Sequence, residues 1–370
     1  MPDKAETASS AAKVGSAVPD IRLSHADLLD FLVACYATAG MGQQDARLIA
    51  EILAELELRG IATHGVMRLP FYIRRLLDGG LNPKPRMTRE SDYPASAVLD
   101  GDHGPGQLVA TQAMEIAIEK ACACGVGFVA VKNSDHFGAS GTFAMQAAKL
   151  DMIGIVWSNA FSVMAPWGGY GNGITNAPLA YAIPAASHDP ILLDISMSAV
   201  SGGKVRLAAK KGERIPKDWV VDKHGRFTDD PNALTDGGAL LPMGGHKGYG
   251  LAVVCDILCG ALSGGPFLTD VPLWFARTAE HSRTGHVMMA LDVSKFRDLD
   301  EFKADVDAVI TRLKATPRME SFDEILVPGE IEFRLEQEYL KDGIPVPEPV
   351  MDDLRKLAAE LDIAMPPPRD

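Results

Sequence analysis

The chain lacks a long apolar stretch and an excess of positive charge, and we expect no secretory leader in it. No run in it approaches the roughly 18 apolar residues that a membrane-spanning helix requires. Its 36 basic residues are outnumbered by 49 acidic ones, for a net charge of −13, whereas duplex binding depends on Lys and Arg that neutralise phosphates. Residues 1–20 have no apolar core of the signal-peptide kind. We therefore expect a cytoplasmic protein that binds neither membranes nor nucleic acid.

Cysteine is also scarce, and its spacing does not suit a structural metal site. Of the five cysteines, Cys122 and Cys124 are two positions apart, and Cys255 and Cys259 are four apart. No Cys-x-x-Cys pair with a matching second pair occurs, so no zinc is expected. Because free cysteine is among the most buried residue types, we expect buried free thiols.

Hydrophobic periodicity predicts helices towards both ends of the chain and a mixed pattern between them. The first helix opens with a capping box from Ser24 to Asp27 and stops at Gly40. Further helices are expected at 45–58, 66–77, 107–124, 139–150, 250–262, 300–315, 330–341 and 348–362. Strands are expected at 128–131, 153–157, 179–183, 191–195 and 286–291.

This order favours an α/β fold in which the two chain ends pack together around an inserted middle. Residues 21–105 and 286–370 would form a helical domain, and residues 106–285 would form the inserted domain. We expect residues 1–20 to be a disordered tail.

A dinucleotide-binding loop of the Rossmann type is missing. The only literal match, Gly125-Val-Gly-Phe-Val-Ala130, follows a helix, and its second half is itself a strand. The motif needs a strand before it and a helix N-terminus after it to receive the pyrophosphate. These glycines are therefore not expected to bind phosphate.

The segment Gly244 to Gly250 admits two interpretations. Its clustered glycines, the cation of Lys247 and the apolar helix that follows suit an anion bound at a helix N-terminus. The same glycines also suit a turn that only leads the chain into the helix.

A second polar segment places His64 and Arg68 four residues apart at the start of the third helix. Imidazole transfers protons near neutral pH, and a guanidinium binds a carboxylate with two parallel hydrogen bonds. Reduction of a 2-oxo acid needs both, a proton for the developing alkoxide and a cation for the carboxylate. The alternative is a solvated pair on a helix surface.

Two further polar segments follow buried strands, where α/β folds commonly place sites. His136 lies in Asn133–Gly138 after the strand that ends at Val131, and the alternative is a loop histidine that caps the next helix. Asp194, with Ser196 and Ser198 beyond it, would orient a histidine, accept ribose hydroxyls or cap a helix.

Taken together, these segments resemble the malate/L-lactate dehydrogenase family, whose nicotinamide domain is not a Rossmann fold. The similar stretches occur in the family's order over residues 25–335, and they are THGVMRLPFYIRRLLDGG, GVGFVAVKNSDHFGASGTFAMQAA, ILLDISMSAVSGGKV, LPMGGHKGYGL and ILVPGEIEFR. The resemblance implies hydride transfer between NAD or NADP and a small 2-oxo or 2-hydroxy acid, or a cyclic imino acid. It also implies a largely antiparallel sheet in the inserted domain and a homodimer with sites near the subunit interface.

The resemblance further implies roles for individual residues. His64 and His136 match the family's two site histidines, of which we favour His64 as the acid/base and place His136 close to the reacting oxygen. Arg68 matches the arginine that binds the substrate carboxylate. The cofactor contacts implied are Leu193, Asp194, Ser196, His246, Lys247, Pro328, Gly329 and Glu330, and for Asp194 the orientation of a histidine is a further implied role.

The chain departs from the family at two places. Thr63 stands where many members have Ser, which keeps the hydroxyl. The segment Ile174–Pro178 replaces Gly-Thr-Asn-Pro with one residue more, so no role is carried onto it. Two alternatives to a dehydrogenase are a catalytically silent dinucleotide-binding protein and a metal hydrolase that uses His64, His136 and His246.

Overall fold

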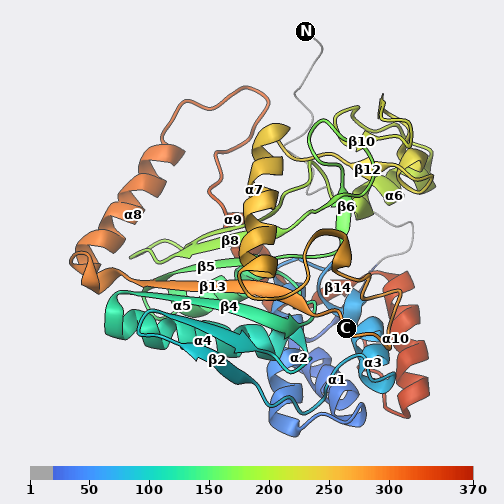
Figure 1. The fold of residues 1–370 in the computed structure, drawn as a ribbon, viewed down its shortest axis with the longest axis horizontal. Coiled ribbons are helices and arrows are strands. Elements are labelled where there is room, and N and C mark those ends of the chain that lie inside the picture. The colour runs from blue at the N-terminus through green and yellow to red at the C-terminus, as the bar shows by residue number, and fades with distance from the viewer. Residues whose placement is uncertain (1–19, 370) are drawn as a thin grey trace. The chain divides into compact units, whose positions relative to one another are not determined.

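The computed structural model (Figure 1) describes residues 20–369. These residues divide into two units. Unit 1 comprises residues 20–73, 184–192 and 297–369, and unit 2 comprises residues 74–183 and 193–296. The expected tail, residues 1–20, lies outside the described residues except for Asp20.

Unit 1 is mainly helical. Its helices are α1 (His25–Thr38), α2 (Gln43–Leu58), the short η1 (Val66–Arg68), the first half of α3 (Leu69–Leu77), α8 (Leu299–Lys314), α9 (Glu330–Asp342) and α10 (Glu348–Leu361). A two-stranded antiparallel sheet joins β1 (Ile21–Leu23) to β14 (Ile344–Val346). The predicted cap of α1 is confirmed, because the Asp27 N–H donates to Ser24 Oγ at 3.0 Å.

Unit 2 is built on a seven-stranded sheet of order β2-β3-β4-β13-β5-β8-β9. Its strands are β2 (Thr88–Asp92), β3 (Ser96–Asp100), β4 (Val126–Ser134), β5 (Met152–Ser158), β8 (Pro178–Ile183), β9 (Ile191–Ser196) and β13 (Thr284–Asp292). The β3–β4 pair is parallel, whereas the β2–β3, β4–β13, β13–β5 and β5–β8 pairs are antiparallel. The expectation of an α/β fold with a largely antiparallel, non-Rossmann sheet is confirmed.

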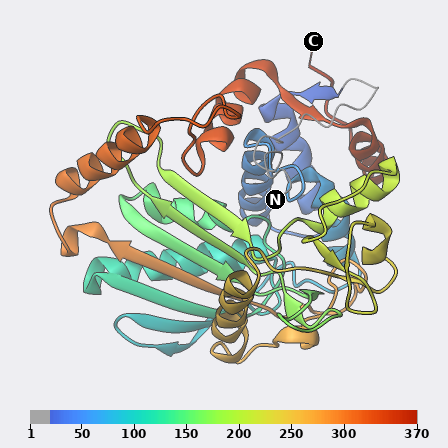
Figure 2. The ribbon, with the colours of Figure 1, turned by 90° about the horizontal axis from the view of Figure 1, so that it is seen from above.

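Helices cover both faces of this sheet, and glycines set how closely they approach. A Cβ on Gly127 of β4 would lie 1.9 Å from the Ala117 carbonyl oxygen of α4 (Gly106–Cys124). A Cβ on Gly154 of β5 would meet α5 (Ser140–Ala148) in the same way. On β13, Gly285 instead faces the π-helical turn η3 (Ile257–Ala261) that extends α7 (His246–Asp256), on the opposite face (Figures 1 and 2).

These contacts explain the glycines that mimic a phosphate loop. Gly125 ends α4 with a φ of 85°, in the left-handed region that favours glycine. Gly127 has no side chain because the α4 backbone occupies that space. Both positions therefore have a structural reason to be glycine.

A second, five-stranded sheet of unit 2 has the order β11-β10-β12-β6-β7. Its strands are β6 (Ser162–Met164), β7 (Ile174–Thr175), β10 (Val220–Val221), β11 (Phe227–Thr228) and β12 (Ala239–Leu240). It is accompanied by α6 (Gly202–Lys211) and η2 (Pro231–Leu234), and the remaining short helices of unit 2 are η4 (Leu268–Asp270) and η5 (Val293–Lys295). None of these elements was expected from the sequence.

The unit boundaries differ from the expected domain boundaries at 105/106 and 285/286. Unit 2 contains all of residues 106–285 except 184–192, and in addition it takes in residues 74–105 and 286–296. The reason is strand pairing, because β2 and β3 extend the sheet beside β4, and β13 lies at its centre between β4 and β5.

The expectation of buried thiols is correct for three cysteines and wrong for two. Cys35, Cys255 and Cys259 are buried, whereas Cys122 and Cys124, in the last turn of α4, are exposed. All five are free thiols. Among residues 20–369, no helix combines the length and the apolar character needed to cross a bilayer.

Candidate active site

His64 and Arg68 of unit 1 lie in the turn that connects α2 to α3. Arg68 ends the η1 turn, and its Nε donates to the Thr63 carbonyl oxygen at 2.7 Å. Thr63 Oγ1 lies 2.9 Å from His64 Nδ1, so the hydroxyl that the resemblance implies is in place. The two residues do not share a helix face as the sequence suggested, because His64 precedes the helix. The turn places His64 next to Arg68 instead.

The charge of Arg68 bears directly on His64. Burial and the neighbouring Arg68 guanidinium lower the pKa of His64 to about 4. The turn therefore presents a neutral imidazole next to a fixed cation at neutral pH. A carboxylate that binds Arg68 would offset this repulsion and raise the pKa of His64.

Beneath this turn lies Glu57, a buried carboxyl group of α2 that the sequence analysis missed. Its Oε1 accepts the Val66 N–H at 2.7 Å, and a Cβ on Gly65 would lie 2.1 Å from that same oxygen. Burial raises the pKa of Glu57 to about 7. A signal was available in the sequence, because Glu57 lies four residues after Leu53 on the apolar stripe of α2.

His136 of unit 2 lies in the loop between β4 and α5. Its ring stacks on Trp274 with centroids 4.5 Å apart and planes 21° from parallel. The next residue, Phe137, packs against Phe143 of α5 and against His286 of β13. Burial lowers the pKa of His286 to about 3, so this imidazole is a neutral part of the sheet core.

Asp194, at the end of β9, caps the helix that follows the His136 loop. Its Oδ2 accepts the Gly141 N–H of α5 at 2.7 Å. Of the three interpretations of Asp194, helix capping is therefore seen, although the capped helix is α5 and not the helix that follows β9. This bond ties β9 to the first turn of α5, the helix that follows the His136 loop.

The segment beyond Asp194 runs beside the chain that leads to His246 and Lys247. The Met243 N–H donates to the Met197 carbonyl, and the Ala199 N–H donates to the Leu241 carbonyl. Two positive-φ glycines, Gly244 and Gly245, then turn the chain into α7, which begins at His246. Gly244 and Gly245 thus form the turn that leads the chain into the helix. The side chains of His246 and Lys247 are exposed and face solvent.

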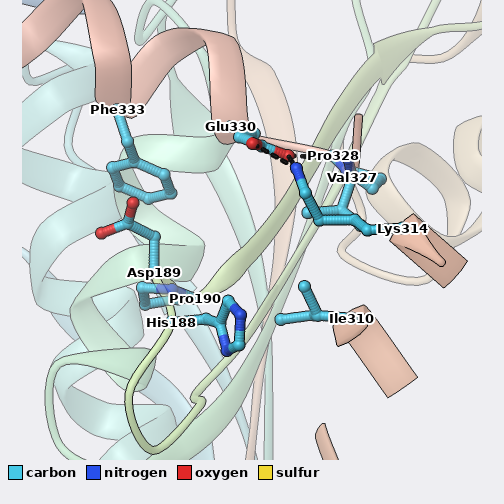
Figure 3. Close-up of a pocket in the computed structure, with 9 residues that line it drawn as sticks. All are labelled: His188, Asp189, Pro190, Ile310, Lys314, Val327, Pro328, Glu330 and Phe333. Carbon is cyan, nitrogen blue, oxygen red and sulfur yellow. Dashed lines mark hydrogen bonds and ion pairs between the residues drawn. The ribbon is translucent and has the colours of Figure 1, made fainter. Parts of the chain in front are cut away.

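Pro328 and Glu330 line a pocket of about 380 Å³ in unit 1, part of it open to solvent (Figure 3). Gly329, between them, has a φ of 94°, and a Cβ there would lie 2.8 Å from Leu192 Cβ. Lys314 forms an ion pair with Glu330 at the rim. The other lining residues are His188, Asp189, Pro190, Ile310, Val327 and Phe333.

The sequence-derived site residues are thus divided between the units. Unit 1 holds His64, Arg68 and Pro328–Glu330, and unit 2 holds His136, Leu193–Ser196, His246 and Lys247. Within the described residues, no three His, Cys, Asp or Glu side chains gather as a metal site would require.

Comparison with known proteins gives a match to the malate/L-lactate dehydrogenase family over residues 23–355. The chain belongs to this family. Membership decides against the metal-hydrolase alternative and accounts for the sheet without a Rossmann motif.

Members of the family resemble the chain over nearly its whole length. A malate dehydrogenase of Pyrococcus abyssi is 37% identical over 350 residues, which cover 93% of this chain and 96% of the relative. The structure of the sulfolactate dehydrogenase of Methanocaldococcus jannaschii matches with a TM-score of 0.88 at 35% identity, covering 93% of this chain and 98% of that one.

Some of the similar proteins are named for NAD(+) and others for NADP(+). A ureidoglycolate dehydrogenase (NAD(+)) of Escherichia coli strain K12 is 32% identical, over 83% of this chain and 87% of the relative. A (2R)-3-sulfolactate dehydrogenase (NADP(+)) of Chromohalobacter salexigens is 33% identical, over 88% of this chain and 95% of the relative.

The buried Glu57 predicts a pH-dependent stability. Its pKa rises from an ordinary 4.5 to about 7 on folding, so its contribution to stability is complete below pH 4.5 and is lost as the pH rises through 7. A glutamine at this position cannot ionise and keeps an acceptor for Val66. As the pH rises from 4.5 to 8, the wild type should therefore lose stability relative to Glu57→Gln. The difference between their free energies of unfolding should change by up to about 3 kcal/mol in favour of the variant, at about 1.4 kcal/mol per pKa unit.

Denaturant unfolding at both pH values measures this difference. Glu55→Gln, on the same helix, is the matched control and should not show the gain. A wild-type-minus-variant difference that stays constant across this pH range would contradict the assignment.

Proposed function

We propose that the protein catalyses reversible hydride transfer between NAD or NADP and C2 of a small 2-oxo or 2-hydroxy acid of the malate or lactate kind, or a cyclic imino acid. The observation that carries the proposal is the turn at Thr63–Arg68. It presents a proton carrier and a carboxylate receptor within one short segment. The names of the relatives support the same class of reaction.

The residues present suit a dinucleotide. Apolar walls from Pro190, Pro328 and Phe333, with a polar rim, suit a planar base and its ribose (Figure 3). The N-terminus of α7, with Lys247 beside it, suits a phosphate anion. We assign cofactor contacts to Leu193, Asp194, Ser196, His246, Lys247, Pro328, Gly329 and Glu330, and the bound nicotinamide supplies or accepts the hydride.

The chain's own residues bind the acid and move the proton. Arg68 holds the substrate carboxylate with two parallel hydrogen bonds, which offsets its repulsion of His64. The pKa of His64 then rises from about 4, and the imidazole donates its proton to the C2 oxygen during reduction and takes it back during oxidation. Because Thr63 engages Nδ1, we assign this transfer to Nε2. General acid catalysis of this kind contributes about 10²–10⁴ in rate.

His136 lies close to the same oxygen in this proposal, and Asp194 holds the helix that follows it. We assign the cofactor-binding role chiefly to unit 2, which contains nearly all of the expected inserted domain, residues 106–285. We also place the protein in the cytoplasm, as its composition suggests, and cell fractionation with an antibody tests that location.

A homodimer is the second part of the proposal. Large apolar side chains on the outer side of α7 and η3 are exposed, namely Leu251, Val254, Ile257 and Leu262. Contiguous exposed apolar side chains of this kind mark protein–protein interfaces. A second copy on α7 would bring the subunit interface next to His246 and Lys247, where the helix begins.

Steady-state kinetics test the catalytic roles. His64→Ala and His136→Ala should each lower kcat by at least 100-fold in a folded protein, because general acid catalysis is lost. Arg68→Lys should mainly raise KM for the 2-oxo acid, since Lys cannot form two parallel hydrogen bonds to a carboxylate. Wild-type kcat in both histidine variants would refute the acid/base assignment, and tight dinucleotide binding without turnover by the wild type would favour a silent binding protein.

The dimer is tested by light scattering coupled to gel filtration. The wild type should have twice the 39.6 kDa chain mass, and Ile257→Glu should shift it towards the monomer because a buried unpaired charge disfavours association. Val309→Glu, at an exposed apolar position on α8, is the control. A wild-type mass of one chain at micromolar concentration would refute the dimer.

A further inference from the structure

The loop that carries His136 is held from three directions. On the backbone side, the His136 N–H donates to Asp135 Oδ1 at 2.8 Å. On the ring side, the imidazole stacks on the buried indole of Trp274. The N-terminus of α4 closes the loop from a third direction, because a Cβ on Gly106 would lie 2.3 Å from the Asp135 carbonyl oxygen.

One guanidinium joins the two supports. Arg75, fully buried near the end of α3, donates from Nη2 to Asp135 Oδ2 at 2.5 Å and from Nη1 to the Trp274 carbonyl oxygen at 3.0 Å. The same two nitrogens also donate to the carbonyl oxygens of Gly80, Arg277 and Glu280. Arg75 therefore fixes the carboxylate next to the His136 backbone and the residue on which its ring lies.

Stability alone does not explain a buried ion pair here. A buried ion pair loses solvation that its attraction repays only with good geometry, and an apolar pair of similar volume is often as stable. Burial raises the pKa of Asp135, which the Arg75 charge and the Ser282 hydroxyl oppose. The ion pair contributes fixed geometry instead. The planar guanidinium donates in set directions to Asp135, next to the His136 backbone, and to the carbonyl of Trp274, on which the His136 ring lies.

We propose that Arg75 and Trp274 are positioning residues for His136. Arg75 links Asp135 to the Trp274 carbonyl, and the Trp274 ring fixes the plane of the imidazole and excludes water from one of its faces. The inference rests on the proposed function, in which His136 lies close to the reacting oxygen. It adds two residues that no motif in the sequence singled out.

Three variants test the proposal at a temperature where each is folded. Trp274→Leu removes the stack but keeps the carbonyl that Arg75 binds, and Asp135→Asn removes the charge but keeps an acceptor for the His136 N–H. Both should lower kcat at least tenfold and leave KM for the 2-oxo acid within threefold, because Arg68 is untouched. Trp274→Phe keeps an aromatic face and should recover most of the lost kcat.

Lys120→Met is the matched control. It removes another ion pair of unit 2, in which Lys120 is buried and its partner Asp92 is exposed. Lys120 lies 14 residues along α4 from Gly106, which is about 21 Å of helix. The variant should lower the melting temperature and leave kcat within twofold.

A readout without turnover separates positioning from general damage. The ring current of an indole shifts protons above its face upfield, so the His136 Hε1 resonance of histidine-labelled protein reports the stack. That resonance should move downfield in Trp274→Leu and in Asp135→Asn. It should keep part of its upfield shift in Trp274→Phe, because a phenyl ring current is smaller than that of an indole, and should stay in place in Lys120→Met.

The outcomes distinguish the inference from the function on which it rests. If His136→Ala is inactive while Trp274→Leu and Asp135→Asn keep wild-type kcat and an unmoved His136 resonance, the positioning role is wrong. If Trp274→Leu and Trp274→Phe lose activity equally, the stack is not what matters and the proposal also fails. If His136→Ala itself keeps wild-type kcat, the proposed function of His136 fails first.

Discussion

The ion pair between Arg75 and Asp135 is the interaction on which the surroundings of His136 in unit 2 depend. Both side chains are closed off from water, and their bonds join the end of α3, the β4–α5 loop and the segment around Trp274. A buried carboxylate without a partner is too costly to keep charged. Removing either partner would therefore release three segments at once, and His136 lies where they meet.

Unit 1 uses a related device around the other histidine. Glu57 is buried beneath the Thr63–Arg68 turn and accepts one backbone N–H, much as Asp135 does beside His136. Burial raises the pKa of both carboxyl groups. The difference is the counter-charge, because the Arg75 cation opposes the rise at Asp135, whereas only the Val66 hydrogen bond opposes it at Glu57, whose pKa reaches about 7. The two turns thus rest on carboxyl groups with different electrostatic surroundings.

Much of the fold could be predicted from the sequence, because its longer elements carry a strong period. The α1 cap at Ser24, the stop at Gly40 and the strands β4, β5 and β13 follow from local patterns. The five-stranded sheet does not, since strands such as β7 and β10 have two residues each and show no alternation. The unit boundaries were also out of reach, because the place of β13 between β4 and β5 is set by pairing across more than a hundred residues.

The candidate site was predicted from residue types whose chemistry suits the reaction. His64, Arg68 and His136 were named this way, and their roles stay predictions. Glu57 and Arg75 were overlooked although each is a charge on an apolar helix stripe, which is a readable signal. Trp274 carried no such signal in the sequence. It lies in an irregular segment, where no hydrophobic periodicity indicates what an aromatic ring will contact. The exposure of Cys122 and Cys124 was likewise hidden, since the last turn of α4 continues an apolar pattern.

The central claim is that this chain delivers hydride to C2 of a 2-oxo acid while its own side chains supply the proton. The most direct measurement is isotope transfer, with NADH and NADPH deuterated at either face of C4 and with pyruvate, oxaloacetate and a cyclic imino acid as acceptors. With cofactor deuterated at one face of C4, mass spectrometry should find one deuterium at C2 of the product. With unlabelled cofactor in heavy water, it should find none at C2. Product without cofactor deuterium, or no reduction of any acceptor, would contradict the account.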